Sequence, residues 1–281
     1  MTTRTRLVLN VYASALMGDD GRTLAAIEGM ERALPGLRLA WEVSKEGQLV
    51  ALPQRDVWLA EAAARGEFPL VCNGDESYPV MISGRGRPAS TSPGGQPQLQ
   101  VHAKLPQDAA VVAAAADVLE QVAEGVRAQW GLMAPLPVMQ VIADQTGPKL
   151  YGPEKPPRGL PALKLPEAMP APEIPRHLGW LNYWSAAAAK AIGFPDPDRD
   201  AELLTRARRT PSGGWGVQLT DAPLDLDNPT HLDALNTRWA RPRRCSAVVP
   251  ERPSSSTAPT RRRRARHLLT GRGSGDRRRS P

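Results

Sequence analysis

The sequence has few cysteines, few aromatic residues and no long apolar run. Its two cysteines, Cys72 and Cys245, are too few for the disulfide framework of a small exported domain. No stretch approaches the roughly 20 apolar residues that a membrane-spanning helix needs. The opening MTTRTRLVLNVYASALMG loosely resembles a signal peptide, but Asn10 interrupts its apolar run, which favours a strand that leads into a turn. We therefore expect a cytoplasmic protein without a membrane partner.

Charge is unevenly distributed along the chain. The whole sequence has a net charge of +7, yet residues 238–281 alone hold 14 arginines against two acidic residues, Glu251 and Asp276. Residues 1–237 therefore hold 22 basic and 27 acidic residues. Because a nucleic-acid-binding surface needs clustered basic residues, the mildly acidic body is not expected to bind nucleic acid.

The last 45 residues, 237–281, are expected to form a disordered, arginine-rich tail. The apolar periodicity of the preceding helix ends at residues 236–237, and the sequence that follows has arginine, proline and serine but no lysine. A GC-rich gene translated out of frame gives this composition, so we interpret the tail as a frameshift product. The alternative is a genuine basic arm, which would bind the phosphates of nucleic acid or of anionic lipid.

The periodicity of apolar residues predicts an α+β fold, with mostly antiparallel sheet and packed helices. Strands are expected near residues 7–12, 37–43, 48–52, 80–83, 98–105, 203–209 and 215–219. Helices are expected near residues 20–34, 54–65 and 108–130, where Asp108 is the cap, and from Pro229 onward. The glycines and prolines of residues 83–97 predict a long hairpin loop.

A proline-rich segment divides the expected domain, residues 1–236. Residues 147–175 contain nine prolines, which exclude regular helix or sheet and predict an extended wrap or a linker. The domain is thus either one unit or two subdomains, residues 1–146 and 176–236. After the segment, HLGWLNYWSAAAAKAIG predicts an aromatic turn and a short helix that Gly193 ends.

Motifs for catalysis, cofactors and metals are weak. Gly84-Arg85-Gly86 lacks the third glycine of a dinucleotide-binding turn, and the histidines are far apart in the sequence, so neither a cofactor nor a metal is expected. Cys72 could form a nucleophilic pair with His102 or His177. However, Cys72 ends the apolar run PLVC and is better interpreted as a core residue. We expect a protein that is not an enzyme, with an enzyme using the Cys72 region as the alternative.

Two groups of residues are candidates for contact with a protein partner. One is aromatic and the other acidic, and their members are Trp180, Tyr183 and Trp184, and Asp221, Asp225 and Asp227. Tryptophan and tyrosine often anchor interfaces, but they also pin proline-rich chains onto a core. The aspartates fit a loop beside a helix, from which they could meet a basic partner.

The tract LGWLNYWS carries a family resemblance. With the proline-rich segment before it and the hairpin and helix after it, the chain resembles the immunity-52 family of bacterial polymorphic-toxin systems and a related uncharacterised myxobacterial domain family. The matching positions are Leu178, Gly179, Trp180, Leu181, Tyr183 and Ser185. The resemblance covers about residues 5–236 and departs from the pattern at Asn182 and Trp184. It implies a small cytoplasmic protein, without catalytic residues, that binds and neutralises a cognate toxin.

Overall fold

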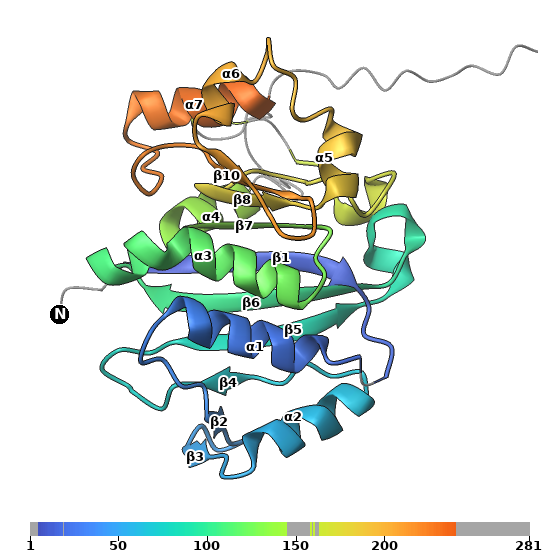
Figure 1. Ribbon diagram of the computed structural model, residues 1–281, viewed down its shortest axis with the longest axis vertical. Helices are drawn as coiled ribbons and strands as arrows, with labels where there is room; N and C mark the ends of the chain where they lie inside the picture. Colours follow the sequence, from blue (N-terminus) through green and yellow to red (C-terminus); the bar gives the residue numbers. More distant parts are fainter. Residues whose placement is uncertain (1–4, 19, 145–157, 159, 161–162, 240–281) are drawn as a thin grey trace, which may run out of the picture. The chain divides into compact units, whose positions relative to one another are not determined.

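The computed structural model describes residues 5–18, 20–144, 158, 160 and 163–239. These residues form an α+β fold around a large antiparallel sheet (Figure 1). The described strands are β1 (Arg6–Ser14), β2 (Trp41–Val43), β3 (Leu49–Ala51), β4 (Val71–Cys72), β5 (Met81–Arg87), β6 (Gln98–Pro106), β7 (Trp130–Pro135), β8 (Leu181–Trp184), β9 (Ala207–Arg209) and β10 (Trp215–Gln218). The described α-helices are α1 (Arg22–Ala33), α2 (Arg55–Ala64), α3 (Ala109–Gly125), α4 (Leu136–Asp144), α5 (Ala186–Ile192), α6 (Ala201–Leu204) and α7 (Pro229–Trp239). Within this part of the chain, no helix is both long and apolar enough to cross a membrane.

The described strands form one sheet, with β3 at one edge and β9 at the other. Its strand order is β3-β2-β4-β5-β6-β1-β7-β8-β10-β9, and each neighbouring pair is antiparallel. The strand β1 lies in the middle, between β6 and β7. The pairing of β7 with β8, where Trp130 lies opposite Trp184, joins the strands before the proline-rich segment to those after it.

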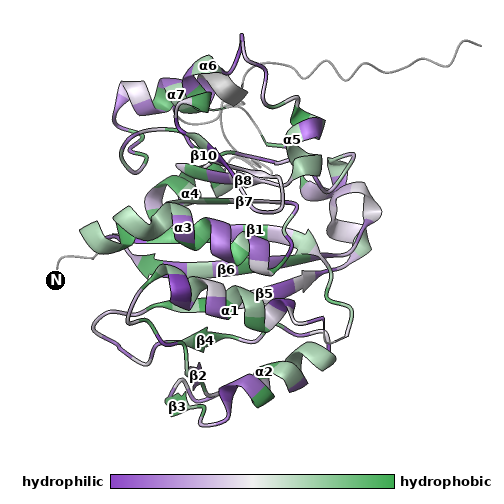
Figure 2. Cartoon of the chain, viewed as in Figure 1, coloured by the Kyte–Doolittle hydropathy of each residue, from purple (hydrophilic) through white to green (hydrophobic). Residues whose placement is uncertain are grey.

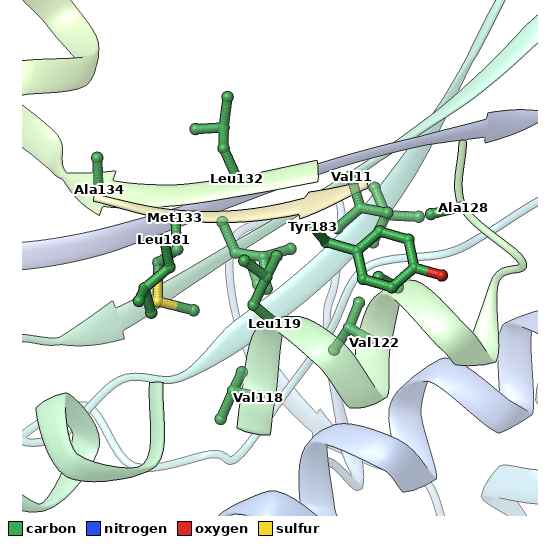
Figure 3. Close-up of a cluster of buried hydrophobic side chains, with 14 of the residues drawn as sticks. Val11, Val118, Leu119, Val122, Ala128, Leu132, Met133, Ala134, Leu181 and Tyr183 are labelled. Carbon is green, nitrogen blue, oxygen red and sulfur yellow. The ribbon is translucent and has the colours of Figure 1, made fainter. Parts of the chain in front are cut away.

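Helices α1 and α3 lie side by side over one face of the sheet, and their outward faces carry hydrophilic residues (Figures 1 and 2). Beneath α3, the side chains of Leu119 and Val122 pack with Val11 of β1 and with Leu181 and Tyr183 of β8 (Figure 3). This stripe of α3 was expected from its spacing, and the cap is confirmed, since the Asp108 carboxylate accepts a hydrogen bond from the amide of Val111 at 3.0 Å.

The two helices touch backbone to backbone, because each has a glycine at the crossing. A Cβ atom added to Gly125 would lie 2.6 Å from the backbone nitrogen of Ala26, and one added to Gly29 would lie 2.8 Å from the carbonyl oxygen of Gln121. Both distances are shorter than a carbon atom tolerates. No larger residue therefore fits at either position without separating the helices.

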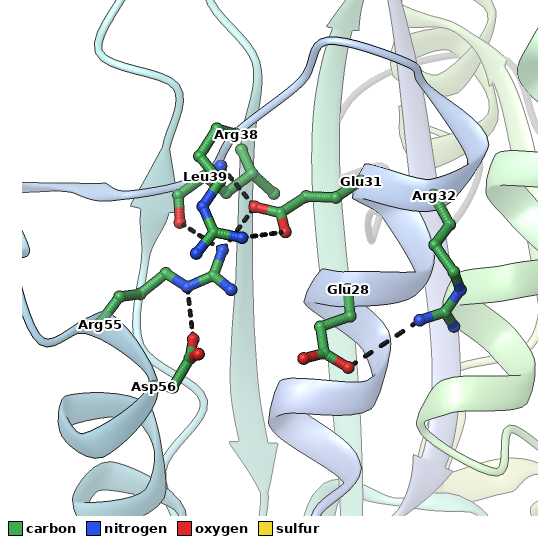
Figure 4. A network of polar contacts seen from close by, with 7 residues as sticks. All are labelled: Glu28, Glu31, Arg32, Arg38, Leu39, Arg55 and Asp56. Atoms are coloured by element: carbon green, nitrogen blue, oxygen red, sulfur yellow. Dashed lines mark hydrogen bonds and ion pairs between the residues drawn. The ribbon is translucent and has the colours of Figure 1, made fainter.

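A buried ion pair ties α2 to α1 (Figure 4). Glu31 accepts hydrogen bonds at one carboxylate oxygen from Arg55 Nη1 at 2.5 Å and from the amide of Leu39 at 2.7 Å. Its second oxygen accepts from Arg38 Nη1 at 3.1 Å. The Arg55 side chain is 3% exposed, and its Nε donates to Asp56 at 2.8 Å. The carboxylate of Glu31 thus satisfies three donors that lie beyond the end of α1.

Several expected elements occur where the patterns placed them, but the strand expected at residues 203–209 is shortened to β9, because α6 extends to Leu204. Four other elements also differ. The first difference concerns the loop expected at residues 83–97. Strand β5 continues to Arg87, so the connection is formed only by the residues after Arg87. Gly84 stays in the ladder because a Cβ there would lie 2.4 Å from Phe68 Cβ, so the glycine makes room for a neighbouring side chain. Glycine in this strand indicates close packing, not a turn.

The second difference concerns the long helix expected at residues 108–130. The helix α3 ends at Gly125, Arg127 has a φ of 53°, and Trp130 begins strand β7, which the sequence reading missed together with α4. All six residues of β7 are buried. A strand that is buried on both faces has no alternation, so its short apolar run cannot be distinguished from helix by periodicity.

The last two differences lie near the C-terminus. The expected aromatic turn is strand β8, and α7 continues to Trp239, past the break expected at residues 236–237. Most of the proline-rich segment, and the tail from residue 240, lie outside the described residues. The described remainder of the segment packs on the fold, since the indole of Trp130 donates to the carbonyl of Pro172 at 3.1 Å.

Candidate functional site

The aromatic residues of LGWLNYWS lie in the core. Trp180, Tyr183 and Trp184 are each 5% exposed or less. The Trp180 indole donates to the carbonyl of Thr220 at 2.9 Å, and the Trp184 ring meets the edge of Phe194 with centroids 4.9 Å apart. A partner on the surface would not reach these rings. In the structure, these rings are packing residues. The sequence allowed this role as the alternative to a role as interface anchors.

Polar residues of the tract shape the chain around β8. The Asn182 side chain accepts from the amide of Gly179 at 2.9 Å and donates to its carbonyl at 3.0 Å, which brackets the entry to the strand. Ser185 caps α5 by accepting from the amide of Ala188 at 3.1 Å, and Gly193 ends that helix with a φ of 67°. The cap at Gly193 was expected from the sequence and is confirmed.

Tyr183 connects the buried tract to the surface. Its hydroxyl donates to Glu124 Oε1 on α3 at 3.0 Å and lies 3.3 Å from the hydroxyl of Ser212, which itself donates to Glu124 at 2.7 Å. Burial, with the added effect of the Glu124 carboxylate, raises the pKa of Tyr183 to about 12. The phenol is therefore neutral and acts as a donor at any physiological pH. The contact joins β8, α3 and the turn of the β9–β10 hairpin.

A shallow groove of about 230 Å³ lies beside Tyr183, between α3 and strands β8, β9 and β10. Its lining includes Glu120 of α3, Arg206 and Arg208 at the start of the hairpin, and Gly216 of β10. The missing side chain of Gly216 leaves room there, since a Cβ atom would find Arg208 Cγ at 3.5 Å and Glu120 Oε2 at 3.7 Å. Cavities that enclose drug-sized ligands are usually larger, at about 300–1,000 Å³.

Ion pairs border this groove. The guanidinium of Arg208 donates to Asp117 Oδ1 at 2.6 Å and to Glu120 Oε2 at 2.8 Å. Arg206 Nε lies 2.9 Å from Asp221 Oδ1. The side chains of Asp117 and Asp221 are 59% and 85% exposed in spite of these pairs. We call the groove and its bordering residues Asp117, Glu120, Arg206, Arg208 and Asp221 the charged groove.

The other two candidate aspartates lie in the loop before α7. Asp225 Oδ1 accepts from the amide of Asp227 at 2.9 Å, and Asp227 Oδ1 accepts from Arg158 at 2.6 Å. Of the six candidate residues, the structure thus brings Tyr183 and Asp221 to the charged groove. Among the described residues, no group of three histidine, cysteine or acidic side chains is arranged to hold a metal ion.

The residues considered for nucleophilic catalysis are apart from this groove. Cys72 is buried and lies opposite Met81 in the pairing of β4 with β5. His102 contacts Asn10 Oδ1 at 3.0 Å, while His177 packs edge-on against Trp130 with centroids 5.8 Å apart. Within the described part of the chain, neither contact brings a histidine nitrogen to the thiol.

The comparisons with known proteins concern the whole fold. The domain family described as "Domain of unknown function (DUF5953)" matches residues 18–244. The chain belongs to this family. Membership of the immunity-52 family stays a prediction. No curated protein matches the chain.

One solved structure similar to this chain is the Pseudomonas aeruginosa T6SS protein PA0821. The two share 13% sequence identity with a TM-score of 0.49, over 84% of this chain and 72% of the other.

Sequence reasoning missed Glu120, Glu124, Arg208 and Ser212 as parts of the site. Nothing in the sequence distinguishes the acidic side of α3 from an ordinary solvated helix face, and no pattern in the hairpin shows which helix its arginines meet. The arginines of the hairpin were a usable signal. Charged residues on a short strand often mark the edge of a sheet, where they protect it against unwanted pairing. The sheet order places β9 at that edge.

Proposed function

We propose that this protein is a non-catalytic binding protein of the immunity type, which neutralises a cognate toxin in the cytoplasm. The class of function comes from the resemblance of the LGWLNYWS tract. The contact surface comes from the charged groove, and this groove is the observation on which the proposal depends.

The charged groove suits a protein surface better than a small substrate. It is small, and its arginines Arg206 and Arg208 pair with Asp221 and Asp117 at its border. The side chains of both aspartates remain more than half exposed. An ionised carboxylate accepts about four hydrogen bonds, so each can bind a partner's donors without losing its arginine. Charges that are already oriented give an interface its specificity and its rate of association. We therefore expect a partner with a basic surface opposite these aspartates.

The buried tract has an indirect part in this proposal. Tyr183 and Ser212 both bond to Glu124, and Glu124 lies on the same helix as Asp117 and Glu120. These bonds hold α3 against the hairpin that carries Arg208. A rigid groove loses less conformational freedom when a partner binds. The tract then contributes to binding by positioning the groove, not by contact.

The proposal predicts that a toxin-domain protein is encoded beside the gene for this chain, and the test uses that protein. The two proteins are produced together in a bacterial host, and growth is measured with and without the full-length chain. We expect the wild type to restore growth and Asp117→Asn with Asp221→Asn to weaken protection. The matched control is Glu67→Gln, since Glu67 is a 58% exposed carboxylate that pairs with Arg65 at 3.0 Å.

Affinity measured on the purified pair completes this test. The double variant should bind at least tenfold more weakly than the wild type, and the association rate should fall as salt is added. Failure of the wild type to protect the host or to form a complex would refute the proposed function. Equal affinity of the double variant and the wild type would remove the charged groove from it.

A further inference from the structure

The sheet face that turns away from α1 and α3 carries a group of basic and polar side chains. Residues directly opposite in antiparallel strands share a face. Arg85 lies opposite Gln100, and Gln100 lies opposite Tyr12, so these three side chains share one face across β5, β6 and β1. Arg87, two residues after Arg85, belongs to the same face. In these strands Val11, on the opposite face, belongs to the core beneath the helices.

A fifth side chain, Arg176, reaches this face from the end of the proline-rich segment. The Trp130 ring stacks on Tyr12 with centroids 4.1 Å apart, and His177 meets the edge of Trp130 at 5.8 Å. The indole of Trp130 also donates to the carbonyl of Pro172. Pro172 and His177 therefore both contact Trp130, which stacks on Tyr12, and Arg176 between them lies within electrostatic reach of Arg87 and Tyr12.

These arginines have no described partner. Among the described residues, the side chains of Arg87 and Arg176 make no hydrogen bond or ion pair, although both residues are partly buried. Burial lowers the pKa of Arg176, and the nearby charge of Arg87 lowers it further. Tyr12 and Glu167 act in the opposite direction and raise this pKa. Burial raises the pKa of Tyr12, while Arg176 and Arg87 lower it. Each of the three groups thus lies within electrostatic reach of the other two, with two like charges close together.

A buried ring nitrogen lies next to this cluster. The Nδ1 atom of His177 has no hydrogen-bond partner, and the residue is 5% exposed. Burial, reinforced by Arg176, lowers the pKa of His177 to about 3. A neutral imidazole can donate one hydrogen bond. The cluster therefore combines two unpaired guanidinium groups, a phenol and an imidazole without a partner, and such buried groups are usually satisfied by water or a ligand.

We propose that Arg87 and Arg176, together with Tyr12, bind a phosphate group on this face of the sheet. A planar guanidinium donates two parallel hydrogen bonds to a phosphate, and two guanidiniums match its double negative charge. A bound dianion would remove the repulsion between the two arginines. The site lies on the face opposite α3 and the charged groove, so it does not depend on the proposed function.

Calorimetric titration of the full 281-residue chain with inorganic phosphate tests this site, at constant ionic strength set with chloride. The arginine-rich tail also attracts phosphate, so matched variants are needed. Arg176→Gln and Arg87→Gln remove one charge at the site, and Arg65→Gln removes one from an exposed pair elsewhere. We expect one saturable site per chain, at least tenfold weaker in the first two variants and unchanged in the third. Equal titrations for all four proteins, or no saturable binding by the wild type, would overturn the proposal.

Thermal unfolding separates a binding role from a structural one. Without phosphate, Arg176→Gln should unfold at the same temperature as the wild type or higher, because one of two like charges is gone. Phosphate should raise the unfolding temperature of the wild type by more than that of the variant, because only the wild type has the complete site. An equal rise in both proteins would contradict the site. If Arg176→Gln does not fold, Arg87→Gln carries the same expectation.

Discussion

Two networks of arginine and carboxylate groups, at opposite ends of the sheet, have nearly the same geometry and different surroundings. Arg55 lies 2.5 Å from Glu31, with side chains 3% and 11% exposed. Arg208 lies 2.6 Å from Asp117, with side chains 47% and 59% exposed. A short distance alone therefore does not show how much an ion pair contributes to stability. The buried pair holds the fold together, because loss of one member strands a charge, while water can replace the exposed pair.

The largest loss of stability is expected when the buried pair of Arg55 and Glu31 is broken. Arg55→Met leaves Glu31 buried with only its bonds to Arg38 and Leu39, and breaking such a pair costs about 3–5 kcal/mol. Urea unfolding of the variant measures this loss. Arg65→Met, at a pair whose members are both 58% exposed, is the control and should lose under about 1 kcal/mol. Similar losses in both variants would show that burial does not separate the two kinds of pair.

The next largest loss of stability is expected at the buried contact between α1 and α3. Gly125→Ala places a Cβ atom 2.6 Å from Ala26, so α1 and α3 must separate at a cost of about 2–3 kcal/mol. Alanine in an ordinary helix position would instead stabilise the fold by about 1 kcal/mol. Gly86→Ala is the control, since a Cβ there meets nothing within 4 Å. A Gly125→Ala variant as stable as the wild type would mean that the helices are not in backbone contact.

Acid should act on the region after the proline-rich segment through His177. The pKa of His177 is about 3 in the fold and 6.5 in the unfolded chain, so the imidazole is neutral in both states only well above pH 6.5. As the pH falls below 6.5, only the unfolded chain takes up the proton, and stability is lost. Between pH 7 and 5 this loss is about 2 kcal/mol.

The check is urea unfolding at both pH values, with His177→Phe as the comparison. The titration of the acidic residues is common to both proteins, so the difference between their pH slopes belongs to His177. The variant should have the shallower slope. Identical slopes would contradict the burial of a neutral imidazole.

The smallest effect on stability is expected at the charged groove. Arg208→Gln removes two ion pairs, but its side chain is 47% exposed, so the cost should stay near 0.5–1 kcal/mol. Complex formation with the partner should weaken more than this, because Asp117 and Glu120 lose the group that orients them. Unfolding and affinity measured on the same protein compare the two losses. A loss of stability above about 2 kcal/mol would place Arg208 among the residues that hold the fold.

Part of the candidate site was within reach of the sequence. The tract around Tyr183 and the aspartate Asp221 were named as candidates, and the structure places both at the charged groove. Their roles depend on residues far along the chain, since Tyr183 meets Glu124 and Asp221 meets Arg206 only after the strands are ordered. A pattern of single residues contains no information on which helix lies over which hairpin.

The sequence by itself determined the elements with local causes. The α3 stripe, the cap at Asp108 and the end of α5 at Gly193 depend on neighbours within one or two helical turns. Only the tertiary structure decided that Trp130 begins a central strand, that Gly125 brings two helices into contact, and that Arg87 and Arg176 lie within electrostatic reach of each other. Burial on both sides removes the period that identifies a strand, and contacts between distant residues follow from strand order and register, which local patterns do not specify.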